Sequence, residues 1–331
     1  MSSRRARTAA LLRSLPVVPT GALDDVVIET PSSVLVPVIL SGPLDHLIID
    51  DCLATSTGSP LMLKCSFDDE ERQGLAAQAA WPAADGVFAR VLWIEDFPHE
   101  DEPMRAALME RAVGARVLGF APGDTLRLCE RIADLHTAPP APSAACARWV
   151  PLDEWFRALT NPQQVHHNEV ARLEPAQTRV IERGREFAQE LLASPLDSAY
   201  LHGDVHHGNL LDFGVTWKFI DPKALHGESL FDYCNLMFNP DLSRSADSQV
   251  FAGRLSIVVN HVEERFSAPL RERYLRWLVA YGALSASWHL EDGGAEQASG
   301  TLAVAARALE QLEQLEQLAA TSPLPQTAPR S

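Results

Sequence analysis

The stretch that most constrains this chain is LHGDVHHGNLLDFGVTWKFIDPKAL, which occupies residues 201–225. It gathers three histidines, three aspartates and an asparagine in one short segment. Apolar pairs flank the polar groups, because Leu210 and Leu211 follow the asparagine while Phe219 and Ile220 precede the last aspartate. Such a density of polar groups indicates a metal cage, a hydrogen-bonded core or the reactive face of an enzyme, and the apolar pairs predict a hairpin beneath it.

The spacing of these residues matches the requirements of phosphoryl transfer. That reaction needs a carboxylate beside the attacking hydroxyl and oxygen ligands that hold Mg²⁺ against nucleotide phosphates. Kinase-like enzymes supply His-x-Asp, an asparagine five positions after that aspartate, and a further aspartate beyond a hairpin. Here the set is His202, Asp204, Asn209 and Asp221. We expect Asp204 to orient the hydroxyl and accept its proton, and Asn209 and Asp221 to bind the metal.

The longer string HGDVHHGNLLDFG…WKFIDPKALHGESLFDY resembles the aminoglycoside phosphotransferases, in particular their streptomycin 6-kinase and hydroxyurea-resistance kinase branch. The resemblance is strong over residues 200–240 and weak before residue 60. It implies an α+β, bilobal protein-kinase-like fold, in which a small N-terminal antiparallel sheet lobe with one helix precedes a larger, mainly helical C-terminal lobe. It also implies ATP or GTP as the phosphate donor, Mg²⁺ as the cofactor and a streptomycin-type aminoglycoside as the substrate. His202 is expected to brace the loop by hydrogen bonding.

The resemblance also points to Lys64, in PLMLKCS, as the residue that pairs with the α and β phosphates of the nucleotide. Its acidic partner is left open by the sequence. Glu70 and Glu71 begin the following helix, whereas the family usually places that glutamate deeper, where this chain has Gln78 or Ala79.

The segment between the lobes and the phosphate loop are less distinct. By resemblance, Glu110, Arg111 and Ala112 fall where the chain passes between the lobes, and backbone groups of Glu110 and Ala112 are expected to hold the adenine. Two glycine-containing stretches, SGP at 41–43 and STGS at 56–59, are both candidates for the phosphate loop, although each also reads as a hairpin turn.

A cationic aminoglycoside requires carboxylates that point into the cleft. The acids nearest the recognised segments are Glu228, Asp232, Glu291 and Asp292. We expect these four to bind the substrate, although helix caps and surface charges explain single acids equally well. Trp288 is expected in the core, with stacking against the substrate as an alternative.

The charge and composition of the chain indicate which classes of partner it can bind. The formal net charge of −16 disfavours nucleic acid and anionic membranes, and it suits a small cationic hydroxylated substrate, although solubility alone also explains acidic proteins. The five cysteines are scattered without a CxxC pair, which predicts reduced core residues. The apolar run near the N-terminus is interrupted by Arg13, and no stretch reaches about 18 apolar residues, so we expect a cytoplasmic protein. Separately, we expect a monomer or a homodimer.

Hydrophobic patterning predicts two kinds of region along the chain. Strands are expected at 32–40, 46–50, 56–66, 87–96 and 104–113, with one helix at 68–81. Later helices are expected at 124–138, 152–159, 174–194 and 270–291, followed by a terminal Glu-Gln-Leu helix that packs on the body. We therefore divide the chain into a nucleotide-binding lobe (1–110), a catalytic and substrate-binding lobe (111–320) and a disordered tail (321–331).

Three alternatives stay open on the sequence. A metallohydrolase would use His202, His206 and His207 as metal ligands, but it needs further ligands at useful spacing elsewhere in the chain. A non-catalytic nucleotide- or ligand-binding relative is favoured by the indistinct phosphate loop and opposed by the intact Asp204, Asn209 and Asp221. Kinases of choline, homoserine or fructosamine share the same scaffold, so the fold does not decide the substrate.

Overall fold

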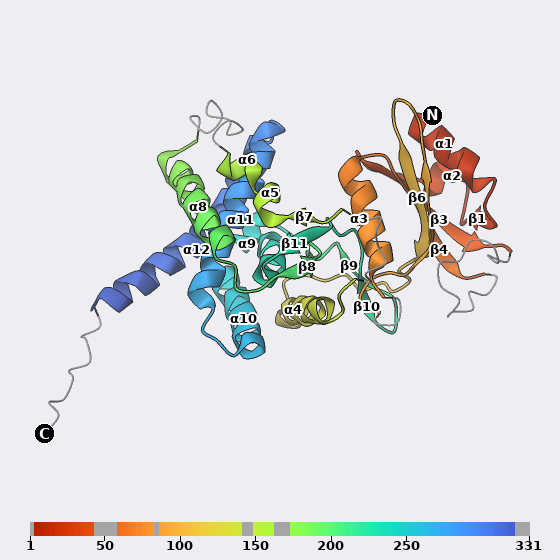
Figure 1. Cartoon of the computed structure of the whole chain (residues 1–331). Coiled ribbons are helices and arrows are strands. Elements are labelled where there is room, and N and C mark those ends of the chain that lie inside the picture. Colours follow the sequence, from red (N-terminus) through yellow and green to blue (C-terminus); the bar gives the residue numbers. More distant parts are fainter. Residues whose placement is uncertain (1–2, 43–57, 83–85, 141–147, 162–172, 322–331) are drawn as a thin grey trace, which may run out of the picture. The chain divides into compact units, whose positions relative to one another are not determined.

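The structure is a computed structural model that describes residues 3–42, 58–82, 86–140, 148–161 and 173–321. It forms two compact units (Figure 1). Unit 1 comprises Met1–Pro151 and Asp197–Asp232, and unit 2 comprises Leu152–Leu196 and Tyr233–Ser331. The functional division at residue 110 stays a prediction. The two compact units divide the chain differently, because residues 111–151 and 197–232 belong to the same unit as the N-terminal sheet. The strand expected at 46–50 lies outside the described residues, as does the tail beyond Thr321.

Unit 1 is built on an antiparallel sheet with the strand order β1-β3-β4-β6-β5, and β2 pairs with β3. Its strands are β1 (Val17–Pro19), β2 (Ile28–Glu29), β3 (Ser33–Leu40), β4 (Pro60–Ser66), β5 (Val91–Phe97) and β6 (Met104–Glu110). Side chains alternate between the two faces of a strand. Leu61, Leu63 and Cys65 of β4 therefore join one buried cluster, while Lys64 is directed to the opposite face.

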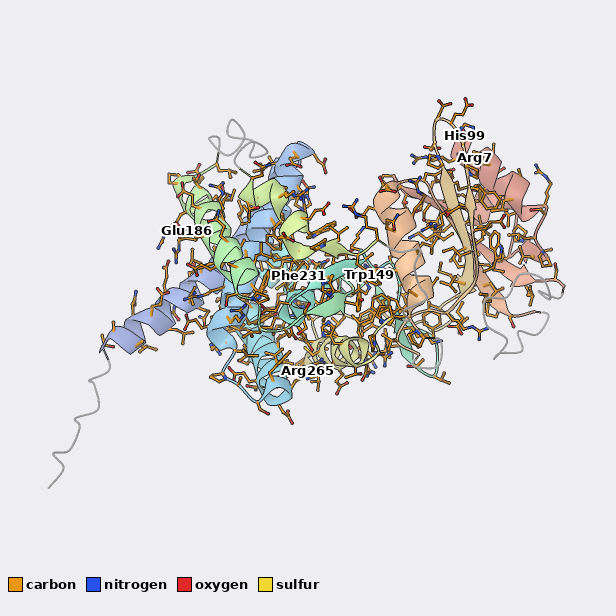
Figure 2. All side chains as sticks on the ribbon, in the orientation of Figure 1. Arg7, His99, Trp149, Glu186, Phe231 and Arg265 are labelled. Carbon is orange, nitrogen blue, oxygen red and sulfur yellow. The ribbon has the colours of Figure 1, made fainter. Side chains whose placement is uncertain are left out.

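Each face of this sheet is covered by a helix (Figure 1). Helix α1 (Ser3–Leu12) and the short α2 (Leu23–Val26) lie on the face of the large cluster, to which Leu11 and Leu12 contribute. Arg7 of α1 also donates to the Glu102 carbonyl, at 2.7 Å, in the turn between β5 and β6 that carries His99 (Figure 2). Helix α3 (Asp69–Ala80) covers the other face, where Leu75 packs with residues of β5 and β6.

The acids at the start of α3 act as the sequence predicts. Asp68 is the N-cap residue, and its carboxylate accepts hydrogen bonds from the backbone N–H groups of Glu70 and Glu71 at 2.9 and 3.4 Å. These bonds satisfy donors that the first turn of a helix leaves without partners, and acidic side chains there also favour the helix dipole. Glu70 and Glu71 are thereby fixed close to the strand that carries Lys64.

The rest of unit 1 contains residues 201–225, the segment rich in histidine and aspartate. Helix α4 (Pro122–Thr137) precedes two small sheets. One sheet has the order β7-β11-β8, with β7 (Val150–Pro151), β8 (Ala199–Leu201) and β11 (Leu225–Gly227), and the other is the hairpin of β9 (Leu210–Asp212) and β10 (Trp217–Phe219). The 3₁₀ helix η2 (Ser229–Tyr233) follows. In the hairpin Leu210 lies opposite Phe219 and both are buried, which confirms the expected hairpin.

Unit 2 is helical. Its elements are α5 (Leu152–Trp155), α6 (Arg157–Thr160), α8 (Pro175–Ala193), η3 (Asn235–Phe238), α9 (Leu242–Ser245), α10 (Ser248–Phe266), α11 (Arg271–Glu291) and α12 (Ala295–Thr321). Helix α11 is buried along most of its length and packs between α8 and α12. One face of α12 is buried between Ala298 and Leu312, and α12 packs against α11 and α8, so the prediction that the terminal helix packs on the body is confirmed.

Two further sequence predictions can be compared with the described residues. Cys65, Cys129 and Cys234 are buried, as expected of core residues. In the described part of the chain, no helix combines the length and apolar character that crossing a membrane requires.

Candidate active site

The loop that joins β8 to β9 places Asp204 beside Asn209. The Asn209 Nδ2 donates to the Asp204 backbone carbonyl at 3.0 Å and to the Asp204 carboxylate at 3.2 Å. Gly203 allows this tight turn, since its φ is +80° and a Cβ there would lie 2.7 Å from Leu225. Because Nδ2 is directed to Asp204, the amide oxygen of Asn209 remains as the atom that a hard cation would take.

His202 braces this loop from within the core. Its side chain is fully buried; Nε2 lies 2.9 Å from the Ile220 carbonyl, and Nδ1 accepts the backbone N–H of Asp204 at 3.2 Å. These contacts require a neutral ring with the proton on Nε2. Burial lowers the pKa of His202 and outweighs the opposing carboxylates of Asp232 and Asp204. His202 is therefore fixed in the core and holds the backbone at Asp204.

Asp232 holds the same loop from the other side. Its carboxylate accepts the backbone N–H groups of His202 at 3.0 Å and Gly203 at 2.7 Å, and it lies 2.9 Å from His136 Nε2. Asp232 and Glu228 are each only 1% exposed. This burial argues against direct contact of either acid with a substrate, in contrast to the sequence expectation.

The hairpin brings Asp221 close to Asn209. The Ile220 N–H donates to the Asn209 carbonyl at 3.0 Å, so the residue before Asp221 is bonded directly to Asn209. Asp221 adopts a left-handed backbone with φ 58°, and its N–H donates to the Gln78 side chain at 3.3 Å. The three residues chosen for their spacing thus converge through hydrogen bonds within unit 1.

Lys64 joins this group from the sheet. Only 3% of it is exposed, and its ammonium lies 2.6 Å from the Glu71 carboxylate and 2.7 Å from the Asp221 carboxylate. Burial alone would lower the pKa of Lys64, but the carboxylates of Asp221 and Glu71 raise it above its usual value. Burial would likewise raise the pKa of Glu71, but Lys64 and Lys223 hold it below its usual range. Lys64 is therefore charged.

The structure resolves which acid pairs with Lys64. Glu71 makes the ion pair from the first turn of α3, while Gln78 lies deeper and bonds to Asp221 and to the Ala89 carbonyl at 2.7 Å. The sequence offered Glu70 and Glu71, which point about 100° apart around the helix axis, so the rotation of α3 on the sheet decides between them. That rotation depends on Gly74, where an added Cβ would lie 2.0 Å from the Pro222 carbonyl.

Glu110 ends β6, where the adenine contact was expected. Its N–H donates to the Arg90 carbonyl at 2.9 Å, and its carboxylate accepts the Arg90 N–H at 3.0 Å and lies 2.5 Å from the Lys218 ammonium. The backbone is thus held firmly at this position. Ala112 is partly exposed, and its role in binding the base stays a prediction.

The remaining expected substrate acids belong to unit 2. Glu291 is the last residue of α11 and Asp292 is its C-cap, and both are exposed. Trp288 is half-buried, and its ring centre lies 5.2 Å from that of Trp155. Contact of Glu291 and Asp292 with the substrate stays a prediction.

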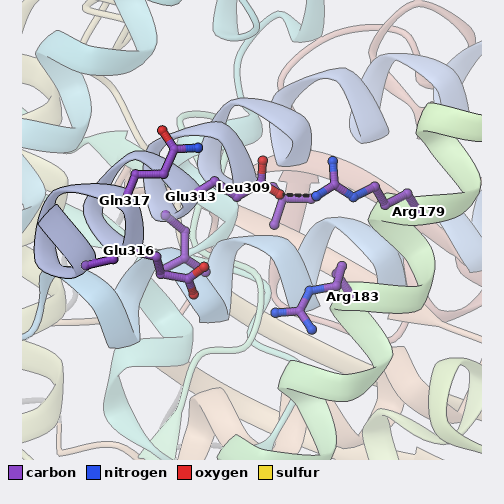
Figure 3. A pocket seen from close by; sticks show the side chains of 8 residues that line it. Arg179, Arg183, Leu309, Glu313, Glu316 and Gln317 are labelled. Atoms are coloured by element: carbon purple, nitrogen blue, oxygen red, sulfur yellow. Dashed lines mark hydrogen bonds and ion pairs between the residues drawn. The ribbon is translucent and has the colours of Figure 1, made fainter.

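A groove of about 540 Å³ also lies in unit 2, between α8 and α12 (Figure 3). It is lined by Arg179, Arg183, Leu309, Leu312, Glu313, Glu316, Gln317 and Ala320. Arg179 binds Glu313 at 2.5 Å within it, so opposite charges neutralise each other there. The groove contains none of the predicted site residues and is separate from the candidate active site.

The donor set is suited to a magnesium nucleotide and poorly suited to zinc. Asn209 and Asp221 offer oxygen atoms, which Mg²⁺ prefers. The site carries two ammonium groups, Lys64 and Lys223, against four carboxylates, Glu70, Glu71, Asp204 and Asp221. Because the carboxylates outnumber the ammonium groups, a negatively charged triphosphate needs divalent cations beside it to bind at this site. Within the described ranges there is no group of three or more His, Cys, Asp or Glu side chains placed to hold a metal, which is what the metallohydrolase alternative requires.

Known structures share this fold. The amicoumacin kinase hAmiN, solved with AMP-PNP, Ca²⁺ and its ligand, covers 94% of this chain and 95% of its own at 13% identity, with a TM-score of 0.59. An aminoglycoside phosphotransferase solved with ADP and hygromycin B covers 93% and 99% at 13% identity and TM-score 0.58. A choline/ethanolamine kinase family protein from Mesorhizobium loti covers 96% and 97% at 18% identity and TM-score 0.58. These matches place the chain in the class of proteins with the protein-kinase-like fold.

Sequence comparison identifies the family. Residues 23–293 match the family described as aminoglycoside/hydroxyurea antibiotic resistance kinase. The streptomycin 3''-kinase of Klebsiella pneumoniae is 36% identical over 250 residues, which span 71% of this chain and 81% of that protein. The chain therefore belongs to the aminoglycoside/hydroxyurea antibiotic resistance kinase family. The predicted family, the bilobal kinase-like fold and the enzyme class, a phosphotransferase with an alcohol acceptor, are confirmed.

Proposed function

We propose that this protein transfers the γ-phosphate of ATP to a hydroxyl of a streptomycin-type aminoglycoside. The observation that carries the choice of substrate is the 36% identity to a streptomycin 3''-kinase over most of both chains. The net charge of −16 is compatible with a cationic substrate.

The residues of unit 1 have separate roles in this proposal. Asp204 accepts the proton of the attacking hydroxyl, and His202 and Asp232 hold it in place through the loop backbone. Asn209 and Asp221 would bind Mg²⁺, which would neutralise charge on the phosphates. Lys64, held by Glu71, would bind the α and β phosphates.

Three further assignments belong to the proposal. The backbone of Glu110 and Ala112 would hold the adenine, and Glu291 and Asp292 would contact the ammonium or guanidinium groups of the substrate. The protein would work in the cytoplasm, where ATP is present, as a monomer or a homodimer.

The test is ATP turnover against a panel of acceptors with the purified protein. Streptomycin should gain one phosphate, detected by mass, whereas choline, homoserine and hydroxyurea serve as alternatives and hygromycin B as a second aminoglycoside. Asp204→Ala should reduce turnover by about 10²–10⁴-fold, the usual contribution of a general base. The proposal fails if streptomycin is not phosphorylated, or if the variant turns over as fast as the wild type.

A further inference from the structure

Lysine is scarce in this chain, and two of its lysines bind the same carboxylate. Of the 28 lysines and arginines in the sequence, three are lysines: Lys64, Lys218 and Lys223. All three belong to unit 1, and each lies within 3.3 Å of a carboxylate. Arginine serves every other basic position in the sequence. The proposed function assigns a role to Lys64 but leaves Lys223 without one.

Lys223 shares a carboxylate with Lys64. One oxygen of Glu71 lies 2.6 Å from the Lys64 ammonium, and the other lies 3.3 Å from the Lys223 ammonium. Lys223 also binds Glu70 at 2.6 Å. Glu71 is thus held by a cation on each side, and its side chain is 18% exposed.

The backbone of Lys223 is fixed independently of its side chain. Its N–H donates to the His202 carbonyl at 2.6 Å, in the loop that carries Asp204. The preceding Pro222 carbonyl lies against Gly74 of α3. The Lys223 backbone is therefore anchored to the loop that carries Asp204, and its side chain extends to the first turn of α3.

We propose that Lys223 is a positioning residue: by holding the second oxygen of Glu71, it keeps Glu71 in place to direct the Lys64 ammonium toward the nucleotide phosphates. The inference rests on the proposed function in so far as Lys64 is the phosphate-binding lysine. Without Lys223, the neighbouring carboxylates of Glu70 and Glu71 lose their shared counter-charge and repel each other. Glu71 is then free to leave Lys64.

The scarcity of lysine makes a direct test practical. Acylation of the purified protein by an amine-reactive reagent, without nucleotide, is followed at each lysine by peptide mass spectrometry. Lys223→Met should accelerate acylation of Lys64 several-fold, because the ion pair with Glu71 protects it, while Lys218 reacts at its wild-type rate as an internal control. Lys223→Arg keeps a cation and should restore the slow rate. Unchanged Lys64 reactivity in Lys223→Met, or equal acceleration at Lys64 and Lys218, would overturn the proposal.

A second measurement separates positioning from direct contact with phosphate. The dissociation constant of a fluorescent ATP analogue with Mg²⁺ is compared for Lys223→Met, Glu71→Gln and the double variant. Lys223→Met should weaken binding about tenfold, and the double variant should bind no more weakly than Glu71→Gln, because both changes disable one unit. Losses that multiply would show that Lys223 acts apart from Glu71 and would refute the inference. Failure of the wild type to bind the analogue would instead contradict the proposed function, while the acylation result would still stand.

Discussion

Asp232→Asn separates two accounts of a residue that the sequence suggested for substrate binding. In the structure, the Asp232 carboxylate accepts two backbone N–H groups of the catalytic loop and faces His136, all in a buried setting. Asparagine has nearly the same shape, but it replaces one accepting oxygen with an NH₂ group. One loop N–H would then face a donor.

The expected cost follows from these contacts. Hydrogen bonds to a charged group contribute about 1.5–3 kcal/mol each, and a buried donor without a partner costs about 1–3 kcal/mol. We expect Asp232→Asn to lower the free energy of unfolding by about 2–4 kcal/mol. In a unit of this size that corresponds to a decrease in Tm of roughly 4–16 °C. Because the loop positions Asp204, kcat should fall while the KM for the aminoglycoside stays nearly constant.

A thermal melt and steady-state kinetics measure both quantities. Asp197→Asn is a matched control, because Asp197 also accepts a backbone N–H and a hydroxyl, both from Ser229, at 2.9 and 2.6 Å, but does not touch the catalytic loop. It should retain kcat. An Asp232→Asn protein with unchanged Tm and kcat but a strongly raised substrate KM would refute the structural reasoning and restore Asp232 as a substrate contact.

Two further predictions concern pH and packing. Burial lowers the pKa of His202 in the folded state, so the folded protein favours the neutral ring. The resulting stability is complete above the unfolded pKa of about 6.5 and is lost as the pH falls toward the lower folded pKa. The free energy of unfolding then decreases by up to about 1.4 kcal/mol per pH unit. His202→Gln should therefore lose less stability than the wild type between pH 7.5 and 5.5 in urea unfolding, and an equal loss would contradict this. Gly74→Ala should lower the Tm despite the better helix propensity of alanine, because overpacking against Pro222 costs about 1–3 kcal/mol; a raised Tm would disprove the close contact.

The sequence predicted the parts of the site that are close together along the chain. Asp204 and Asn209 precede one hairpin and Asp221 follows it, so their spacing and the apolar residues between them were sufficient to bring them together. The strands around Lys64 were likewise evident, since their apolar residues dominate one buried face of the sheet. Local patterning determines such features before any tertiary contact is known.

Contacts between distant segments could not be read in the same way. Glu70 and Glu71 are adjacent on one helix, and only the packing of α3 against Pro222 determines which of them reaches Lys64. An aspartate in FDY looks the same whether it faces solvent or holds a buried loop, so the role of Asp232 required coordinates. The contacts of Lys223 required coordinates for the same reason, because its partners lie on a helix far away in the sequence.

The central claim is that Asp221, Asn209 and Asp204 act together with Lys64 on a magnesium nucleotide. Its most direct test is the Mg²⁺ dependence of phosphate transfer to streptomycin by the wild type and by Asp221→Asn, with the fold monitored by circular dichroism. The account predicts that the variant folds normally but loses roughly 10²–10³-fold in kcat, as expected when one electrostatic clamp is removed, and needs more Mg²⁺ for half-maximal rate. A folded Asp221→Asn enzyme with wild-type turnover and wild-type Mg²⁺ requirement would contradict it.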